Sequence, residues 1–375
     1  MRKHNSLLSI QGFGQSVWLE YIRRRMIMEG ELQQFITQDG LRGVTSNPPM
    51  LEQVIARSGD YDADLRLMAR QGRSEEDIYD ALTIKDIGMA ADQMRPLYER
   101  SDGKHGFVSL GLNPHLAYDE ESTLAEAYRL WGVVDRPNVM IKVPATDAGL
   151  RCFRELVRDG INVNLTLLFG LKRYRQAAEV YIEALEDRVE DHKPVNWIAS
   201  VAGFSVGRLG AMIDDILNHR AELPNAAAQV ERLYGRVGVA CAKSAYQIYK
   251  EIFDGERFAA MRQKGALPLR LVWVGTGPGA APSEDLKLME ELIGGPDTII
   301  SMSPETLTAY RAKGSPEPRL TQAGQAAAEI LASLPELDIN IDQVARSLEE
   351  QGIESFIRSY DRLMATIEKA RYEAL

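Results

Sequence analysis

Cysteine is scarce in this chain of 375 residues, which contains only Cys152 and Cys241, far apart and outside any C-x-x-C or Cys/His cluster. A disulfide framework or a structural zinc site is therefore not expected, and a reducing compartment is favoured. The five histidines, among them His105 and His115, show no metal-ligand spacing and accompany no obvious nucleophile. We assign them structural roles.

The chain also lacks a basic surplus and a long apolar run. Lys and Arg together number 44 against 54 Asp and Glu, a formal net charge of −10, so no excess of cations is available to neutralise a nucleic-acid backbone. No stretch reaches the roughly 18 apolar residues of a membrane span, and the apolar run before Gly14 is too short for a signal peptide. We therefore expect a cytoplasmic protein that binds neither nucleic acid nor membrane, as a monomer or a homodimer.

Short apolar segments rich in β-branched residues recur along the chain, and most are followed by residues at helical spacing, such as Tyr174, Ala177 and Tyr181. We expect eight strands, in the ranges 16–21, 43–47, 107–112, 139–143, 161–167, 197–201, 269–276 and 298–302. Strands that alternate with helices predict a parallel sheet and an α/β fold. Eight such units favour a closed (β/α)8 TIM barrel over an open doubly wound sheet.

Local signals mark the starts of several helices. Ser74, Thr123 and Ser303 each precede an acidic residue or a proline at the spacing typical of a helix N-cap. These signals agree with the apolar spacing that follows them.

Two connections, 51–106 and 204–268, are longer than a barrel requires, and we expect helical insertions there because neither contains a Pro/Gly/Ser-rich linker. A last helix, packed on the barrel or across its mouth, is predicted by four apolar residues at helical spacing in the tail: Phe356, Tyr360, Leu363 and Ile367. We therefore expect residues 1–375 to form a single domain.

The segment 138–146 places one lysine, Lys142, near the carboxyl end of an apolar strand. Burial of an ammonium in apolar surroundings lowers its pKa, so a neutral amine becomes available to attack a carbonyl and form a Schiff base. The carboxyl ends of barrel strands carry the active site. Two other interpretations stay open from the residues alone: a lysine that points outward between helices, and one paired with an internal carboxylate.

Two further strands carry polar side chains that we expect to meet at the same mouth: Thr45, Ser46 and Asn47 at the end of the second strand, and Asn162, Asn164 and Thr166 at alternate positions of the fifth. Period-two spacing aims the last three at one face. Polar groups on a buried strand need partners, which a hydroxyl-rich substrate or an internal layer of hydrogen bonds with water would supply.

Glu20 closes the first predicted strand and is the best carboxylate candidate for general acid/base work if it faces the barrel axis. A salt bridge to Arg23 or Arg24 is the alternative. Both interpretations place the carboxylate at the carboxyl end of a strand.

Two turns rich in small residues follow the sixth and seventh predicted strands. The glycine-rich run 273–279 can present backbone N–H groups to an anion. A dinucleotide site is a weaker match, because Pro278 interrupts the expected glycine pattern. The other turn, 202–208, ends in Arg208, which is either a clamp for a phosphate or carboxylate or an ordinary surface residue.

The segments Gly-Val-Thr-Ser-Asn-Pro at 43–48 and Val-Met-Ile-Lys-Val-Pro-Ala-Thr at 139–146 resemble the two signature segments of transaldolases. Further segments similar to the longer bacterial form of that family, at 14–19, 113–117, 162–169 and from 297 onward, extend the resemblance over nearly the whole chain. The resemblance implies a single (β/α)8 barrel that transfers a dihydroxyacetone unit between sugar phosphates through a lysine Schiff base, without a metal or an organic cofactor.

The resemblance also implies a role for each matching residue. Lys142 would attack the ketose carbonyl, Glu20 would accept the proton of the leaving hydroxyl, and Thr166 would assist a proton-carrying water. Contacts to the substrate would come from the remaining matching residues: Asn47, Asn164 and Ser46 near the dihydroxyacetone unit, and Arg208 at the phosphate.

Several positions depart from the family pattern. Glu20 stands where aspartate is usual, and Gly111 stands where the family has a glutamate that positions the catalytic water. Gly203, Ser205 and Gly279 replace a serine, an aromatic residue and a lysine near the phosphate. Loss of a charged hydrogen bond forfeits about 1.5–3 kcal/mol, so affinity for ordinary sugar phosphates should fall unless other groups compensate.

Three hypotheses about function follow from these residues. The first is a transaldolase that uses ordinary phosphorylated sugars, and the second is a Schiff-base aldolase or transferase adapted to another carbonyl substrate. The retained lysine supports both. The third, a catalytically silent barrel that binds a metabolite, is favoured by Gly111 and disfavoured by retention of Lys142, Asn47, Asn164 and Thr166.

Overall fold

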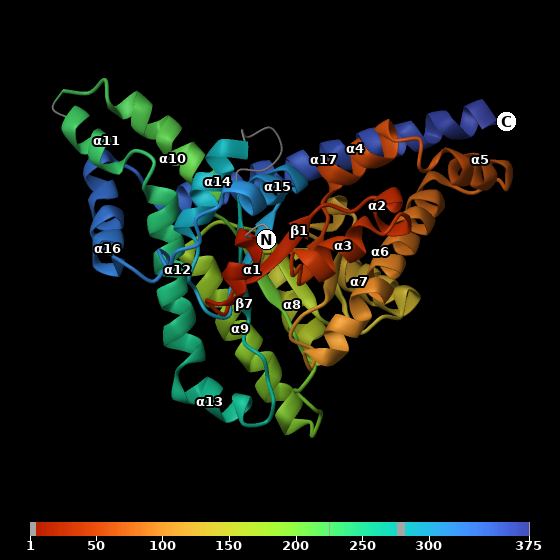
Figure 1. The fold of residues 1–375 in the computed structure, drawn as a ribbon, viewed down its shortest axis with the longest axis horizontal. Helices are drawn as coiled ribbons and strands as arrows, with labels where there is room; N and C mark the ends of the chain where they lie inside the picture. The colour runs from red at the N-terminus through yellow and green to blue at the C-terminus, as the bar shows by residue number, and fades with distance from the viewer. Residues whose placement is uncertain (1–4, 225, 276–281, 375) are drawn as a thin grey trace.

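Over residues 5–224, 226–275 and 282–374, which a computed structural model describes, eight parallel strands pair in chain order and close into a barrel in which β8 pairs with β1 (Figure 1). The strands are β1 (Ser16–Glu20), β2 (Gly43–Thr45), β3 (Phe107–Gly111), β4 (Val139–Pro144), β5 (Val163–Leu168), β6 (Val201–Ser205), β7 (Arg270–Val274) and β8 (Ile299–Met302). The predicted (β/α)8 barrel is therefore confirmed.

Helices cover the outside of the barrel and fill the connections between strands. In the described part of the chain they are α1 (Ser6–Gln11), α2 (Arg24–Met28), α3 (Glu31–Gln38), α4 (Pro48–Arg57), α5 (Asp62–Arg70), α6 (Glu75–Arg100), α7 (Glu120–Val134), α8 (Asp147–Arg158), α9 (Leu171–Glu190), α10 (Val206–Arg220), α11 (Ala227–Leu233), α12 (Val237–Phe253), α13 (Glu256–Arg262), α14 (Pro282–Glu291), α15 (Pro304–Lys313), α16 (Gly324–Ser333) and α17 (Ile341–Ala374), with 3-10 turns η1 (Pro114–Leu116) and η2 (Leu334–Leu337). The two long connections hold α4 to α6 and α10 to α13, so both are helical as predicted. None of these helices is long and apolar enough to cross a membrane.

Apolar side chains form two separate clusters, one inside the barrel and one between the barrel and its helices. The inner cluster includes Trp18, Phe107, Met140, Val201 and Ile299, each from a different strand. Burial of such side chains stabilises the closed barrel by about 25 cal/mol for each Å² of apolar surface removed from water. Because this layer fills the middle of the barrel, polar side chains on the same strands gather at its ends.

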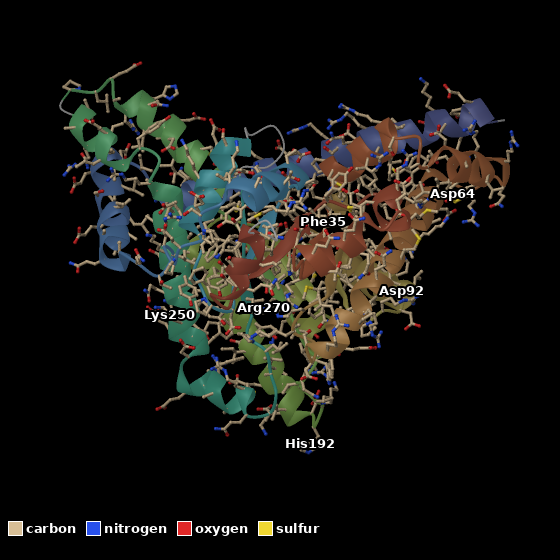
Figure 2. All side chains as sticks on the ribbon, in the orientation of Figure 1. Phe35, Asp64, Asp92, His192, Lys250 and Arg270 are labelled. Carbon is tan, nitrogen blue, oxygen red and sulfur yellow. The ribbon has the colours of Figure 1, made fainter. Side chains whose placement is uncertain are left out.

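The amino-terminal end of the barrel holds a buried guanidinium. Arg270, the first residue of β7, is 2% exposed and lies near the middle of the molecule, whereas Asp92 and His192 project from its periphery (Figure 2). The carboxyl end of the barrel holds the candidate site.

Seven of the predicted strands agree with observed strands to within two residues, and the sixth is wrong by four. The prediction was 197–201, whereas β6 is Val201–Ser205. Trp197 lies in a loop with φ of 71° and is 42% exposed, a conformation that a bulky residue rarely adopts in a strand. The small residues of 202–205, taken from the sequence as a turn, are strand residues, and Arg208 lies in the first turn of α10.

One helix start was also predicted wrongly. Ser74 and Ser303 cap α6 and α15 by accepting hydrogen bonds from backbone N–H groups, as expected. Helix α7 starts earlier than Thr123, at Glu120, and its cap is Asp119, whose side chain accepts from the N–H of Ser122. Asp is as good a cap as Thr, and the earlier start adds two carboxylates to the first turn.

The long C-terminal helix α17 crosses the carboxyl end of the barrel. It packs against α4, α5 and α6, and also contacts β5 and α10; Figure 1 shows α4 lying alongside it. Tyr360, Leu363 and Ile367 are buried in this packing. The tail therefore packs on the protein and covers the barrel mouth at the same time.

Candidate active site

The carboxyl ends of the strands open into a cavity of about 430 Å³. Residues from seven of the eight strand ends contribute to its wall, and α17 supplies part of the roof. The residues used below are Glu20, Thr45, Asn47, Lys142, Asn164, Thr166, Leu167, Gly203, Ser205, Arg208, Ser301, Ser355, Phe356, Ser359 and Arg362.

Lys142 projects into this cavity from β4 and is 8% exposed. Its Nζ donates hydrogen bonds to the carbonyl oxygen of Ser46 at 2.8 Å and to Oγ1 of Thr45 at 3.3 Å. Burial lowers the pKa of the ammonium, and the negative charge of Glu20 opposes part of that effect. The lysine therefore points toward the barrel axis, and the outward-pointing alternative is wrong.

Glu20 ends β1 and faces the same cavity. Its Oε1 accepts a hydrogen bond from Nδ2 of Asn47 at 2.7 Å. Burial raises the pKa of the Glu20 carboxyl, while Lys142 and the Asn47 hydrogen bond lower it and Asp285 raises it further. Arg23 and Arg24 form ion pairs with Asp60, Asp64 and Asp86 instead of with Glu20.

Burial therefore shifts the two ionisable groups of the cavity in opposite directions, each toward its uncharged form. An amine with a lowered pKa can act as a nucleophile, and a carboxyl with a raised pKa can give and take protons at higher pH than an ordinary one. The attraction between Lys142 and Glu20 limits both shifts. This arrangement suits covalent catalysis on a carbonyl with proton transfer at a neighbouring oxygen.

Asn47 is fixed by the start of the helix that follows it. As the N-cap of α4, its Oδ1 accepts from the backbone N–H of Met50 at 2.9 Å, and Pro48 occupies the first helical position. The cap orients the amide so that its Nδ2 points to Glu20. Local sequence thus fixes a polar group that the cavity uses.

Asn164 and Thr166 face the cavity from alternate positions of β5, as predicted. Asn164 pairs in register with Lys142 on the neighbouring strand, and its Nδ2 donates to Oγ of Ser109 at 2.9 Å. Asn162 does not join them. It precedes β5, and its side chain bonds the backbone of Pro137 and Ala199 at the opposite end of the barrel.

Ser46 lies next to the cavity without lining it. It is not among the residues that line the cavity; its carbonyl receives the Lys142 hydrogen bond, and its hydroxyl donates to the carbonyl of Ser109 at 3.4 Å. Consecutive strand residues face opposite sides, so Thr45 and Asn47 face the cavity and Ser46 does not. The substrate contact expected of Ser46 stays a prediction.

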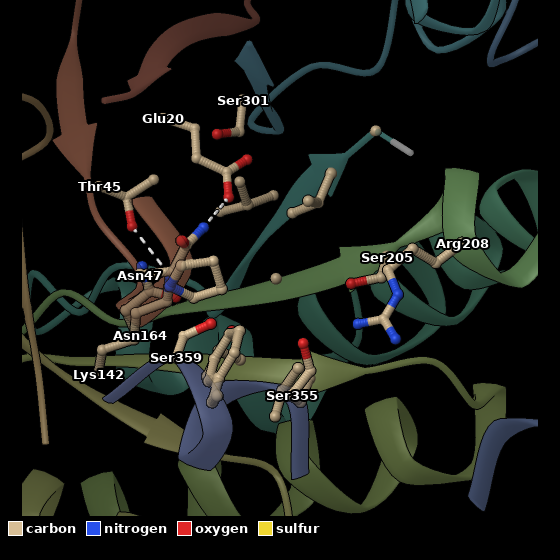
Figure 3. A pocket seen from close by; sticks show the side chains of 18 of the residues that line it. Glu20, Thr45, Asn47, Lys142, Asn164, Ser205, Arg208, Ser301, Ser355 and Ser359 are labelled. Atoms are coloured by element: carbon tan, nitrogen blue, oxygen red, sulfur yellow. Dashed lines mark hydrogen bonds between the residues drawn. The ribbon is translucent and has the colours of Figure 1, made fainter. Parts of the chain in front are cut away.

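Arg208 lies at the end of the cavity away from Lys142 (Figure 3). Its guanidinium lies 5.5 Å from the ring centroid of Phe169, and burial lowers its pKa. Among the described residues, none forms a hydrogen bond or ion pair with this guanidinium. A partly buried cation without a carboxylate partner can bind an anionic group of a ligand.

Three departures from the family pattern lie in or beside the cavity. Gly203 and Ser205 line it from β6. Gly111 pairs in register with Lys142, and a Cβ added there would have no described atom within 4 Å. Gly279 and the rest of 276–281 lie outside the described residues, so the expected anion-binding turn is described only up to Gly275.

Several cavity residues were missed from the sequence. Ser301, on β8, has a buried hydroxyl without a hydrogen-bond partner in the described chain. Ser355, Phe356 and Ser359 reach the cavity from α17. Alternation within 298–302 could have singled out Ser301, but contacts from a distant helix depend on how that helix docks.

A second cavity of about 800 Å³ shares Glu20 and Ser301 with the first.

Comparisons with known proteins agree over the length of the chain. A family described as Transaldolase/Fructose-6-phosphate aldolase matches residues 17–367. The chain is 37% identical over 370 residues to a transaldolase of Trichodesmium erythraeum (strain IMS101), covering 97% of each chain. It is 39% identical over 364 residues to a transaldolase of Thiobacillus denitrificans (strain ATCC 25259 / T1), covering 97% of this chain and 99% of the other.

Proposed function

Because the chain belongs to the transaldolase/fructose-6-phosphate aldolase family, we propose that it transfers a dihydroxyacetone unit between sugar phosphates through a Schiff base on Lys142. The observation that carries this proposal is the buried amine at the cavity, with a lowered pKa and a carboxyl group facing the same space. Sugar phosphates are the substrate class: the donor is a ketose phosphate, the acceptor is an aldose phosphate, and the carbonyl end of each reacts at Lys142.

The first step is attack of the Lys142 amine on the ketose carbonyl, with loss of water to give an imine. The hydrogen bonds to Ser46 and Thr45 hold Nζ at the carboxyl end of β2. The imine withdraws electrons from the neighbouring carbon bond, so that this bond can break. Before attack the amine must be uncharged, which its burial favours.

Carbon bond cleavage requires a base for the departing hydroxyl proton, and Glu20 takes that role. The aldose leaves as an aldehyde, and the three-carbon unit stays on Lys142 as an enamine. Addition of the enamine to a second aldehyde reverses these steps, with Glu20 returning the proton. Thr166 holds the water that carries protons during imine formation and hydrolysis.

Hydroxyl groups of the dihydroxyacetone unit need partners in a buried cavity. Asn47 and Asn164 flank Lys142 and supply amide groups for them. Arg208 binds the phosphate at the far end of the cavity, where its guanidinium has no ion pair with the described residues. With these three assignments, the reacting carbonyl end of the substrate lies at Lys142 and its phosphate lies at the opposite end of the cavity.

A second candidate function is Schiff-base chemistry on another carbonyl substrate. Gly111 favours it, because the register partner of Lys142 has no side chain to position water. Gly203 favours it as well, because β6 offers no hydroxyl at that point of the wall. A metabolite-binding barrel without catalytic activity has less support, because Lys142, Glu20 and Asn164 all line the same cavity.

We also propose that residues 1–375 act as one domain in the cytoplasm. Helix α17 packs back on α4 and α5, near the start of the chain, and Cys152 and Cys241 are both buried free thiols. Light scattering of the purified chain would decide between monomer and homodimer.

The experiment that tests the function is borohydride reduction in the presence of fructose 6-phosphate, followed by peptide mass mapping. The wild-type chain should gain a reduced three-carbon or six-carbon adduct on Lys142 alone. The variant Lys142→Met, which keeps an unbranched side chain one atom shorter, should gain none. An adduct only with other carbonyl compounds would support the second candidate, and no adduct with any carbonyl would contradict both.

A further inference from the structure

The polar groups of the cavity fall into two sets. Around Lys142, Thr45 accepts from the lysine, Asn47 donates to Glu20, and Asn164 donates to Ser109. The hydroxyls of Thr166 and Ser301 have no hydrogen-bond partner among the described residues. At the far end, Arg208, Ser205 and Ser355 form no side-chain hydrogen bond with any described residue. Their donors are therefore available to a ligand.

Helix α17 reaches this far end because a glycine allows a close approach. A Cβ at Gly352 would lie 2.7 Å from Cδ2 of Leu167 and 3.5 Å from Nη1 of Arg208. Residues three and seven positions further along lie on the same face of a helix. Ser355 and Ser359 occupy those positions, and both line the cavity.

The two serines of α17 differ in how they are bonded. Ser359 is 2% exposed, and its Oγ accepts from Nη2 of Arg362 at 2.9 Å, while Arg362 is paired with Glu52 at 2.7 Å. Ser359 therefore belongs to a network that holds α17 against α4. Ser355 has no such partner in the described chain, and Figure 3 shows it at the same end of the cavity as Arg208 and Ser205.

The cavity wall formed by β6 has no side chain at position 203. Gly203 faces the cavity from β6, and the backbone leaves little room there, since a Cβ would lie 3.2 Å from the carbonyl oxygen of Leu165. Ser205, two residues further along the strand, faces the same side and carries the hydroxyl that position 203 lacks. Hydroxyls from β6 and from α17 thus lie at the same end of the cavity as the cationic Arg208 (Figure 3).

We propose that Ser355 of the C-terminal helix is a specificity-determining residue, which together with Ser205 and Arg208 binds the phosphate monoester at the end of an open-chain sugar. The inference rests on the proposed function for the identity of the sugar, but phosphate binding itself does not require the lysine chemistry. Two hydroxyls and a guanidinium match the three charged acceptor oxygens of a phosphate. Occupancy of this subsite also bridges the barrel to α17.

The test uses sorbitol 6-phosphate, which has no carbonyl and cannot form an imine, with sorbitol as the unphosphorylated reference. Calorimetric titration of the full chain should show sorbitol 6-phosphate binding weakened about tenfold by Ser355→Ala. The variant Ser355→Thr, which keeps a hydroxyl, should restore most of the affinity. The matched control Ser347→Ala, on the same helix but away from the cavity lining, should bind like the wild type.

Equal affinity of wild type and Ser355→Ala for sorbitol 6-phosphate would overturn the proposal, as would an equal loss for sorbitol. Loss of affinity in Ser347→Ala to the same degree would assign the effect to the helix as a whole and overturn it as well. The borohydride experiment is independent of these outcomes. A chain that binds sorbitol 6-phosphate through Ser355 but forms no adduct on Lys142 would retain the subsite and refute the proposed function.

Discussion

Asn47 donates a hydrogen bond from Nδ2 to the Glu20 carboxylate over 2.7 Å while its Oδ1 caps helix α4. One side chain therefore links the ionisation of a carboxyl group to the start of a helix. Because the two bonds use different atoms, substitutions can separate them.

We predict that Asn47→Ala and Asn47→Ser have the same effect on the pH profile and different effects on stability. Both remove the donor to Glu20, which raises the pKa of the carboxyl further. If Glu20 acts as the base, the acidic limb of kcat/KM moves to higher pH in both variants. Serine still caps α4, so only Asn47→Ala loses about 1 kcal/mol of unfolding free energy.

Profiles of kcat/KM against pH, together with urea unfolding, check this prediction. An unshifted acidic limb in both variants would mean that the titration of Glu20 does not limit the reaction. Equal destabilisation by Ser and Ala would contradict the capping argument.

The two ionisable groups of the cavity, Glu20 and Lys142, predict a pH dependence of stability. Burial raises the pKa of Glu20 above 4.5, so above that value the native chain holds a proton that the unfolded chain has released, and stability falls as pH rises through this window. Removal of the Lys142 charge by Lys142→Met raises that pKa further and widens the window. The buried ammonium acts in the opposite direction: its lowered pKa makes wild-type stability rise with pH between the folded and unfolded pKa values of Lys142. Lys142→Met removes that rise.

We therefore expect the unfolding free energy of Lys142→Met to fall relative to wild type as pH rises above 4.5. Urea unfolding at several pH values measures the difference. The double variant Glu20→Gln/Lys142→Met, which lacks both groups, should show none of the extra decline. Parallel curves for wild type and Lys142→Met would contradict both the lysine's own contribution and its effect on Glu20.

Strand order and the inward-facing strand-end residues could be predicted from the sequence, because alternation along a buried strand is a local property. Lys142, Asn164 and Thr166 lie where that rule places them. The same alternation places Thr45 and Asn47 on the cavity side and turns Ser46 away from it. The error at β6 arose because Gly203 indicates a turn by composition, whereas here it is a strand residue where the Leu165 carbonyl approaches closely.

Contacts that depend on tertiary docking could not be predicted. The sequence shows that α17 is a helix with an apolar face, but its serines reach the cavity only because Gly352 lets it lie close to Leu167. The sequence also could not show that the guanidinium of Arg208 would lack an ion pair, because many other arginines of this chain do form one. Whether an arginine forms an ion pair depends on which carboxylates the tertiary structure brings near it.

The space beside Lys142 leads to a prediction for Gly111. A glutamate there would project to the same face of the barrel as Lys142, with room for its Cβ. If a missing water-positioning acid limits turnover, Gly111→Glu should raise kcat for transfer from fructose 6-phosphate to erythrose 4-phosphate by about a hundredfold, the lower end of general acid/base contributions. Coupled assay of both variants Gly111→Glu and Gly111→Gln checks this.

The glutamine variant is the matched control, since it fills the same volume without a titratable group. An equal gain from Gln would assign the effect to packing or hydrogen bonding. Unchanged or lower turnover in Gly111→Glu would refute the diagnosis of a missing acid.

Helix α17 provides the last prediction, in which two physical effects have opposite signs. Alanine is favoured over glycine inside a helix by about 1 kcal/mol, so an isolated α17 would be stabilised by Gly352→Ala. In the folded chain the new methyl would meet Leu167 at 2.7 Å. Leu167 has φ of 55° at an irregular register between β5 and β6, and it is buried, so its side chain has little room to move away.

We therefore expect Gly352→Ala to lower the unfolding free energy by about 1–3 kcal/mol despite its helix propensity, and to raise the KM for fructose 6-phosphate as α17 moves away from Arg208. Gly132→Ala in α7 is the matched control: it lies on an exposed helix face where a Cβ meets no described atom within 4 Å. That variant should gain up to about 1 kcal/mol and keep its KM. If both substitutions stabilise the chain equally, the close packing of α17 on the barrel mouth is refuted, and with it the route by which Ser355 reaches the substrate.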